Sequence, residues 1–350
     1  MEAWFSREWQ RNGAWQFVLR PISWVFQLLA MIRRVAYRAG LLKSTNAGVP
    51  VIIVGNITVG GTGKTPIVLA LVEALTTSGK SCGIVTRGYR SHANRSNRIA
   101  THVAPGEQAA TEGGDEAALL AHRCVAPVYA GADRVSAAQM LLRNHEEVDA
   151  IISDDGLQHY ALQRAIEICV IDAGRALGNG ALLPAGPLRE PASRLATVDA
   201  IVINRNHGVG PRRADELQFP AAIPVFDMTL GNEMFINLRT QQCLDRNAAL
   251  AAFQGLSIHA LAGTGNPQRF FSHLSSLGMN LASTLAFPDH HDFQADDLSA
   301  TGAAIVLMTE KDAVKCGSIA DERMWFMRVD AVLPKAFTDF VLKKLSDTKE

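Results

Sequence analysis

The sequence VIIVGNITVGGTGKTP at Val51–Pro66 combines a strand signal, a glycine-rich loop and the start of a helix. The β-branched run at 51–54 predicts a buried strand, and the apolar stretch from Ile67 predicts a helix. A glycine-rich loop between them turns backbone N–H groups inward around an anion, and the positive end of the helix dipole points at the same anion. The stretch therefore predicts a phosphate-binding loop, or P-loop.

Eight consecutive residues are expected to hold a nucleotide: Thr58, Val59, Gly60, Gly61, Thr62, Gly63, Lys64 and Thr65. Lys64 would reach the β- and γ-phosphates, and the Thr65 hydroxyl would bind Mg²⁺. Thr58 stands where the pattern G-x-x-x-x-G-K-[ST] has a glycine. We expect Gly60 and Gly61 to supply the backbone conformational freedom that a glycine at position 58 would have given. The alternative is a turn with a chance Lys-Thr, which the flanking strand and helix argue against.

Size and composition restrict the class of protein. The 350 residues are 48% hydrophobic and 19% charged, which is typical of a folded chain with one large or two ordinary domains. The net charge of zero does not favour nucleic-acid binding. The five cysteines are scattered without a C-x-x-C, so neither a disulfide framework nor a zinc site is expected. We interpret them as buried thiols in a reducing cytosol.

The charge is unevenly distributed along the chain. Residues 9–72 contain no acidic side chain, and residues 1–72 hold eight Lys and Arg against two Glu. Four of the five tryptophans also lie in the first 24 residues. The apolar run Pro21–Ile32 is flanked by arginines but is shorter than the roughly 20 residues that span a bilayer. We expect a helix lying on the cytoplasmic leaflet; a helix packed on the core is the alternative, and a signal peptide fits poorly.

Past the P-loop, β-branched runs alternate with stretches of helical spacing. Such alternation predicts an α/β fold, a mostly parallel P-loop sheet with helices on both faces. Candidate helices include Asp115–Arg123 and Ser136–Glu147, and candidate strands are Gly83–Thr86, Ala150–Ser153, Ile166–Ile171 and Ala200–Ile203.

A second, smaller α/β pattern begins near residue 225. Its candidate strands are Val225–Met228, His259–Ala262, Ile305–Thr309 and Trp325–Val329. We therefore expect three parts: a basic, Trp-rich membrane-interface segment at 1–45, a P-loop core at 46–225, and a smaller α/β domain at 226–350 that closes over the active site.

An acidic motif follows the candidate strand at Ala150–Ser153. Asp154, Asp155 and His159 lie in SDDGLQH, and an apolar strand that ends in acid places a carboxylate beside the Mg²⁺ of a P-loop. Adjacent residues of an extended chain face opposite ways, so at most one Asp is expected to face the metal unless the strand has ended. His159 would orient one of them or contact phosphate. A plain turn is the alternative.

Three further motifs carry side chains suited to phosphoryl transfer. The loop LPAGPLRE presents Arg189, which could stabilise charge on the phosphoryl group, and Glu190, which could complete a metal shell. Taken alone, this motif fits a purely structural loop better. Asp115 in GGDE is either an N-cap or a base near the P-loop. In FPDHHDF the acids and histidines are too close in sequence for a metal site, so a carboxylate-oriented His acting as acid or base fits better, with a polar surface turn as the alternative.

Basic side chains follow other strands at the same sheet edge. Arg87, Tyr89 and Arg90 lie in TRGYR, and Arg134 lies in GADR. Ligands bind beyond the carboxyl ends of parallel strands, so these residues are candidate contacts for an anionic or sugar acceptor. Judged singly, each arginine fits a plain surface position better than a ligand contact.

Taken together, these motifs resemble the tetraacyldisaccharide 4′-kinases, the lipid A 4′-kinases of Gram-negative bacteria. The matching stretches are VGNITVGGTGKTP, TRGYR, GGDE, DDGLQH, GNGALLPAGPLRE, FPDHH and MTEKDAVKC, in this order from residue 54 to residue 316. Their order and number make the resemblance specific. The basic aromatic N-terminus also suits a family whose substrate is embedded in a membrane.

The resemblance implies an activity, its cofactors and its location. ATP with Mg²⁺ would phosphorylate the 4′-hydroxyl of a tetraacyl-disaccharide 1-phosphate, giving the 1,4′-bisphosphate in lipid A biosynthesis. Because its partner would be a glycolipid, the protein is expected to act at the cytoplasmic face of the inner membrane. The family also implies two α/β domains joined by a short β-ribbon, with the active site in the cleft.

The resemblance also implies roles for individual residues. Asp115 and His290 occupy the positions of the Asp–His pair that activates the hydroxyl, although His291 leaves the choice of histidine open. The metal-side acids match Asp154, Asp155 and Glu190, and the phosphate-side arginines match Arg134 and Arg189. One departure is Ala117, where the family often has Pro after Gly-Asp-Glu.

Two other classes of protein remain as alternatives. A nucleotide-switched membrane ATPase or GTPase would need no acceptor site, and it would release inorganic phosphate. A soluble small-molecule kinase would not need the acid-free, Trp-rich N-terminus.

Overall fold

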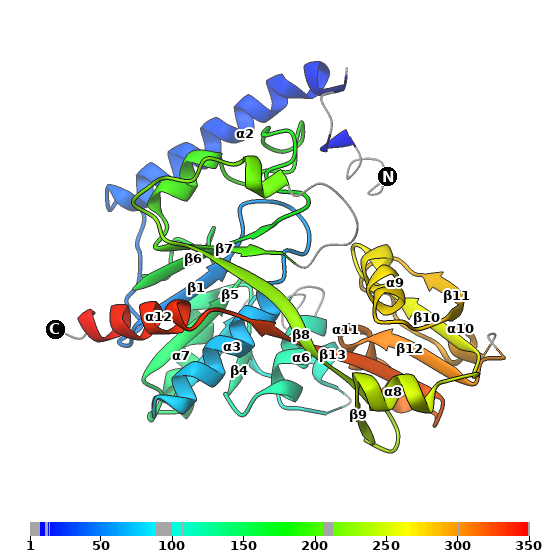
Figure 1. Cartoon of the computed structure of the whole chain (residues 1–350). Helices are drawn as coiled ribbons and strands as arrows, with labels where there is room; N and C mark the ends of the chain where they lie inside the picture. The colour runs from blue at the N-terminus through cyan, green and yellow to red at the C-terminus, as the bar shows by residue number, and fades with distance from the viewer. Residues whose placement is uncertain are drawn as a thin grey trace.

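The computed structural model describes residues 8–10, 13, 15–88, 100–106, 108–205, 213–299 and 302–348. Thirteen strands within these ranges form one mixed sheet (Figure 1). They are β1 (Val51–Gly55), β2 (Cys82–Thr86), β3 (Thr101–His102), β4 (Val128–Ala130), β5 (Ala150–Asp154), β6 (Ile166–Asp172), β7 (Ala200–Asn204), β8 (Val225–Asn237), β9 (Cys243–Asp245), β10 (Ile258–Ala262), β11 (Leu281–Ala286), β12 (Ile305–Thr309) and β13 (Met324–Val332).

The described helices connect or cover these strands. The α-helices are α2 (Trp15–Arg38), α3 (Lys64–Thr77), α5 (Ala109–Gly113), α6 (Asp115–Arg123), α7 (Arg134–Asn144), α8 (Arg246–Ala252), α9 (Pro267–Ser276), α10 (Ala295–Ser299), α11 (Glu310–Ala313) and α12 (Lys335–Asp347). Short 3₁₀ helices lie at Ala192–Thr197, Arg213–Glu216 and Gly317–Ile319.

The order of strands divides the sheet into two bodies. The path runs β11-β10-β12-β13-β8-β7-β6-β1-β5-β2-β4-β3, with β9 paired to β8. We call the part built on β1–β7 the P-loop body, and the part built on β10–β12 the C-terminal body. Strand β8 belongs to both, because Val225–Met228 pairs in parallel with β7 whereas Thr229–Asn237 pairs antiparallel with β13. Figure 1 shows β8 and β13 running from one body to the other.

Strand β1 is covered on both faces, as its uninterrupted apolar run predicts. Ile52 and Val54 join a core with residues of α3, α6 and α12. Val51 and Ile53 point to the opposite face, into a core that contains residues of α7. The parallel α/β architecture expected from the sequence is confirmed, and it fixes the loop after β1 at the carboxyl edge of the sheet.

The last helix departs from the expected smaller unit at 226–350. Helix α12 follows β13 but returns to the P-loop body, where Phe337, Val341 and Leu345 join the core of β1 and α3. Each of these side chains is at most 2% exposed. The C-terminal body is therefore linked to the P-loop body at both ends of its chain segment, through β8 and through β13.

Most of the large apolar side chains of helix α2 are exposed, and the two side chains that it buries are polar. The helix is longer than the run Pro21–Ile32, with 24 residues and an 18-residue window whose mean hydropathy is 1.2, so by length and composition it could cross a membrane. Only Gln16 and Ser23 are buried. The outward face carries large exposed apolar residues, namely Trp15, Phe17, Val18, Ile22, Trp24, Val25, Leu28, Leu29, Met31, Ile32 and Val35. This arrangement is the reverse of a helix packed on a soluble core.

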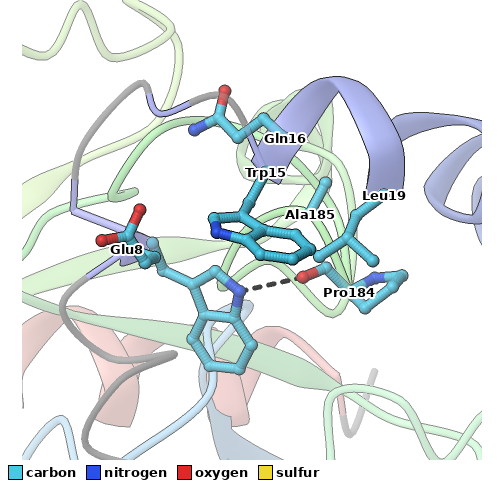
Figure 2. Close-up of a pocket in the computed structure, with 7 residues that line it drawn as sticks. Glu8, Trp15, Gln16, Leu19, Pro184 and Ala185 are labelled. Atoms are coloured by element: carbon cyan, nitrogen blue, oxygen red, sulfur yellow. Dashed lines mark hydrogen bonds between the residues drawn. The ribbon is translucent and has the colours of Figure 1, made fainter.

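The inner face of α2 is fixed to the loop that precedes Arg189. Ser23 Oγ donates to Leu182 O at 2.9 Å and accepts from Ala185 N at 3.0 Å. Trp9 Nε1 donates to Pro184 O at 2.9 Å, and Figure 2 shows Pro184 and Ala185 beside Trp15 and Leu19 of α2. These bonds hold α2 against the P-loop body through polar contacts and leave its apolar face outward.

The cysteines are all free thiols, but they are not all buried. Cys82, Cys169 and Cys316 are buried, as expected, and burial raises the pKa of each to about 12. Cys124 is half-buried, and Cys243, on the short strand β9, is exposed. The expectation of a buried thiol is therefore wrong for Cys243, because β9 pairs only at the side of β8.

Candidate active site

The P-loop takes its shape from two glycines and an asparagine. Gly60 and Gly63 have φ of +95° and +90°, whereas Gly61 is not among the residues with positive φ. Thr58 does not need positive φ either, which explains why a side chain is tolerated there. Asn56, which sequence reasoning did not single out, donates through Nδ2 to Thr58 O at 2.8 Å and to Gly60 O at 3.3 Å. The loop is thus held from inside before any ligand binds.

Two side chains that sequence reasoning missed pack on the outside of the loop. Asn204, at the end of β7, donates to Thr62 O at 3.0 Å, and a Cβ on Gly63 would lie 2.4 Å from its Nδ2. Arg175 bonds Gly61 O and lies where a Cβ on Gly60 would stand. Arg175 follows β6 and Asn204 ends β7, so both residues lie at the carboxyl edge of the sheet. This position is the feature from which the sequence could have predicted their place beside the P-loop.

The loop that carries Arg189 is bonded to the P-loop backbone. Arg189 N donates to Ile57 O at 2.7 Å, and Val59 N donates to Pro187 O at 2.8 Å. Arg189 Nη1 then reaches Asp155 Oδ2 at 3.1 Å, while Lys64 Nζ lies 3.3 Å from Asp155 Oδ1. The structure therefore brings Lys64, Asp155 and Arg189 together. Burial acts to raise the pKa of Asp155, but Lys64 and Arg189 outweigh it and hold that pKa below its ordinary value.

Asp154 differs sharply from its neighbour. It ends β5, is 0% exposed, and neither carboxylate oxygen has a hydrogen-bond partner among the residues described. Burial, and next the charge of Glu116, raise its pKa to about 7. Asp155 has already left the strand and adopts φ of +50°. A buried carboxylate without a donor fits a cation, so the residues present are suited to Mg²⁺ beside phosphate.

The expected metal residues are not equivalent in the structure. Thr65 lies in the first turn of α3, directly after Lys64. Glu190 is 5% exposed, and its oxygens accept hydrogen bonds from Tyr160 and from Gln158 at 3.2 Å. Arg194 Nε lies 3.6 Å from the same carboxylate. Over the described ranges, no group of three His, Cys, Asp or Glu side chains is placed to hold a metal alone. A metal here would need phosphate oxygens or water to complete its shell.

The Asp–His pair is formed between the two bodies. His290 Nδ1 lies 3.0 Å from Asp115 Oδ2, with Asp115 in the first turn of α6 and His290 on the loop after β11. His290 has φ of +62°, a rare conformation for a non-glycine residue that is found at functional sites. Gly114, not Asp115, is the N-cap of α6, so the capping interpretation of Asp115 is wrong.

The neighbouring histidine has a different environment. His291 Nε2 lies 2.8 Å from Asp297 Oδ2, and its ring stacks on Phe287 at 4.6 Å between centroids. Phe293 packs edge-on at 4.9 Å. His291 is thereby engaged within its own loop, and His290 is the partner of Asp115.

Three of the acceptor-side candidates, Arg87, Arg134 and His159, follow strands at the same edge of the sheet. Arg134 is 4% exposed and its Nη2 lies 3.5 Å from Asp155 O; burial lowers its pKa to about 10. His159 Nε2 is 4.0 Å from Asp133 Oδ1, and burial, then Arg134, lower the pKa of His159 to about 4. Arg87 is exposed just after β2. Tyr89, like Arg90, lies outside the described residues.

Comparison with known proteins agrees with this site. The family profile described as tetraacyldisaccharide-1-P 4′-kinase matches residues 15–346. A tetraacyldisaccharide 4′-kinase of Methylobacillus flagellatus is 46% identical over 347 residues, 99% of this chain and 97% of that protein. The one from Herminiimonas arsenicoxydans is 43% identical over 350 residues, 99% and 96% of the two chains.

Solved structures show the same relationship. The crystal structure of "apo" form LpxK from Aquifex aeolicus in complex with ATP is similar with a TM-score of 0.76 at 26% identity. The match covers 94% of this chain and 99% of that chain. By profile, by sequence identity over nearly its whole length and by fold, this chain belongs to the tetraacyldisaccharide 4′-kinase family.

Proposed function

We propose that this chain transfers the γ-phosphate of ATP to the 4′-hydroxyl of a tetraacyl-disaccharide 1-phosphate. The observation that carries the proposal is the contact between Asp115 and His290, a base formed by two bodies beside a P-loop. The two sites are close: Glu116, next to Asp115, acts on the pKa values of both Asp154 and Lys311. A nucleotide switch needs no acceptor site, so it would not require a base assembled from two bodies.

In this proposal the P-loop residues position and neutralise the triphosphate. Lys64 and Arg189 bind phosphate oxygens once they are released from Asp155, and backbone N–H groups of 58–65 surround the β-phosphate. Asp154, Asp155 and Thr65 would hold Mg²⁺, with Glu190 as a further candidate. The metal supplies charge neutralisation between the phosphates when bound.

The Asp–His pair activates the acceptor. With Nδ1–H donating to Asp115, Nε2 is the ring nitrogen of His290 that would accept the proton of the sugar hydroxyl once the acceptor is bound. Asp289 Oδ2 lies 3.7 Å from that Nε2. Residues 46–225 with α12 form the kinase core, and the C-terminal body delivers His290 and excludes water when it closes.

The acceptor is proposed to arrive from a membrane surface. The apolar outer face of α2 inserts among lipids, and its arginines meet anionic headgroups on the cytoplasmic leaflet of the inner membrane. A cavity of about 290 Å³ lies between α2 and Glu190, lined in part by Met31, Arg34 and Arg38. Apolar and cationic groups side by side suit an acylated sugar phosphate.

The decisive experiment determines which product receives the γ-phosphate of ATP. Wild-type protein is incubated with γ-labelled ATP, Mg²⁺ and vesicles that contain the tetraacyl-disaccharide 1-phosphate, and the products are separated. Label in the glycolipid is expected, and chelation of Mg²⁺ should abolish it. Release of inorganic phosphate without labelled glycolipid would instead support the nucleotide switch.

Membrane binding is predicted to depend on the outer face of α2. Trp24 and Leu28 are 64% and 51% exposed, so the double change Trp24→Glu/Leu28→Glu costs no core contact but removes apolar area from the bilayer. We expect vesicle sedimentation to fall by at least 10-fold, roughly the effect of 1.4 kcal/mol. Val125→Glu, at a 97% exposed position outside α2, is the matched control. Equal sedimentation of both variants would contradict the proposed orientation.

A further inference from the structure

The motif MTEKDAVKC, at Met308–Cys316, has no role in the mechanism so far. It begins at the end of β12, where Thr309 caps α11 by accepting from Asp312 N. Asp312 is 0% exposed, and its Oδ2 accepts from Thr309 Oγ1 at 2.7 Å and from Gly263 N at 2.9 Å. Its other oxygen accepts from Lys315 Nζ at 3.1 Å. The motif therefore fixes a buried carboxylate, which in turn fixes a lysine.

Lys315 joins three separate segments with one ammonium group. Besides Asp312, Nζ donates to His291 O at 2.8 Å, on the loop that carries His290. It also lies 3.5 Å from Asp115 Oδ2, the oxygen that contacts His290. An ammonium has three N–H donors, and three acceptors surround this one. The side chain is 7% exposed, so water screens these contacts only weakly.

We propose that Lys315 is a positioning residue for phosphoryl transfer, holding the Asp115 carboxylate and the His290 loop in register across the two bodies. This inference rests on the proposed kinase function. Lys315 belongs to the C-terminal body and Asp115 to the P-loop body, so its contact with Asp115 crosses from one body to the other, whereas its contacts with His291 and Asp312 lie within its own body. The lysine thus ties the Asp–His pair to the contact between the two bodies.

The charges around Asp115 determine the sign of the expected pH effect. Burial acts to raise the pKa of Asp115, but the hydrogen bond with His290 and the charges of Lys315, Lys311 and His290 lower it below its ordinary value. Lys311 is itself bonded to Asp289 at 3.0 Å. The other facing charges are the carboxylates of Glu116, Asp289 and Asp312. Without the positive charge of Lys315, the Asp–His pair binds a proton more readily. The pKa of the pair therefore rises, and the pair stays protonated to higher pH.

The test compares Lys315→Met, Lys315→Gln and Lys315→Arg in the full-length enzyme, with Mg²⁺·ATP and the glycolipid in vesicles. Both neutral variants are expected to move the acid limb of the kcat/KM profile upward by about one pH unit. They should also lower kcat by up to about 10²-fold, as expected for a displaced base. The KM for ATP should stay unchanged, and Lys315→Arg should restore the wild-type pH profile.

Two controls keep the outcomes separate. Lys343→Met removes an exposed lysine of α12 and should leave both kcat and the pH profile unchanged. If Lys315→Met does not fold, Lys315→Gln, which can still bond His291 O, gives the same comparison. A neutral variant with lowered kcat but the wild-type pH profile overturns the inference while the kinase function stands. Wild-type protein that labels no glycolipid overturns the function, and the inference with it.

Discussion

Replacing His290 with alanine is expected to lower kcat by roughly 10²–10⁴-fold, because the variant lacks the group that accepts the hydroxyl proton. ATP binding should persist, since His290 contacts Asp115 and Asp289 and is not part of the P-loop. The measurement is transfer of γ-label to the glycolipid at saturating ATP. The rise in Tm on adding ATP, recorded on the same samples, reports nucleotide binding separately.

Asp115 should behave as part of the same unit. Asp115→Asn keeps the shape of the side chain but removes the charge that orients the imidazole, and we expect a loss of similar order. Because the two residues act together, the double variant should be little worse than either single one. His259→Ala is the matched control, since His259 lies on β10 and its Nδ1 is 2.7 Å from Ser283 Oγ of the neighbouring strand β11, away from the P-loop and from Asp115. Near-wild-type turnover of His290→Ala would remove the proposed base.

Features that depend on neighbouring residues could be predicted from the sequence. The P-loop needs a strand, glycines and a helix in immediate succession, and VIIVGNITVGGTGKTP supplies all three, so its place after β1 was predictable. The longer apolar strands were found for the same reason. Strands β3, β4 and β9 were missed because each has only two or three residues. The edge strand β11 was missed because LASTLA at 281–286 has few β-branched side chains, and its residues alternate between half-buried and exposed.

Features that depend on folding across the chain could not be predicted from residues alone. The pairing of Asp115 with His290, rather than His291, follows from a loop conformation with positive φ and from the aromatic rings that hold His291. The contact of Lys315 with Asp115 joins residues far apart in sequence and in different bodies. The return of α12 to the P-loop body was hidden too, because the apolar spacing of α12 shows that it is amphipathic but not which core it covers.

The second large effect is expected at Asp154. Asp154→Asn should lower kcat by about 10²–10³-fold, because a neutral amide is a poorer ligand for Mg²⁺ and stabilises less charge on the transferred group. The unliganded variant should nevertheless be at least as stable as the wild type. The cause is that a buried carboxylate without a hydrogen-bond donor costs more free energy than a buried amide.

The loss of kcat and the retained stability of Asp154→Asn together distinguish a metal ligand from a residue with a purely structural role. Tm is measured without nucleotide, with ATP, and with ATP plus Mg²⁺, for wild type, Asp154→Asn and the exposed control Asp339→Asn. A metal ligand predicts that the extra rise caused by Mg²⁺ disappears in Asp154→Asn alone, while its unliganded Tm does not fall. A structural residue predicts the opposite: a lower unliganded Tm and an undiminished response to Mg²⁺. Because both oxygens of Asp154 lack a donor in the described structure, the first pattern is the one expected.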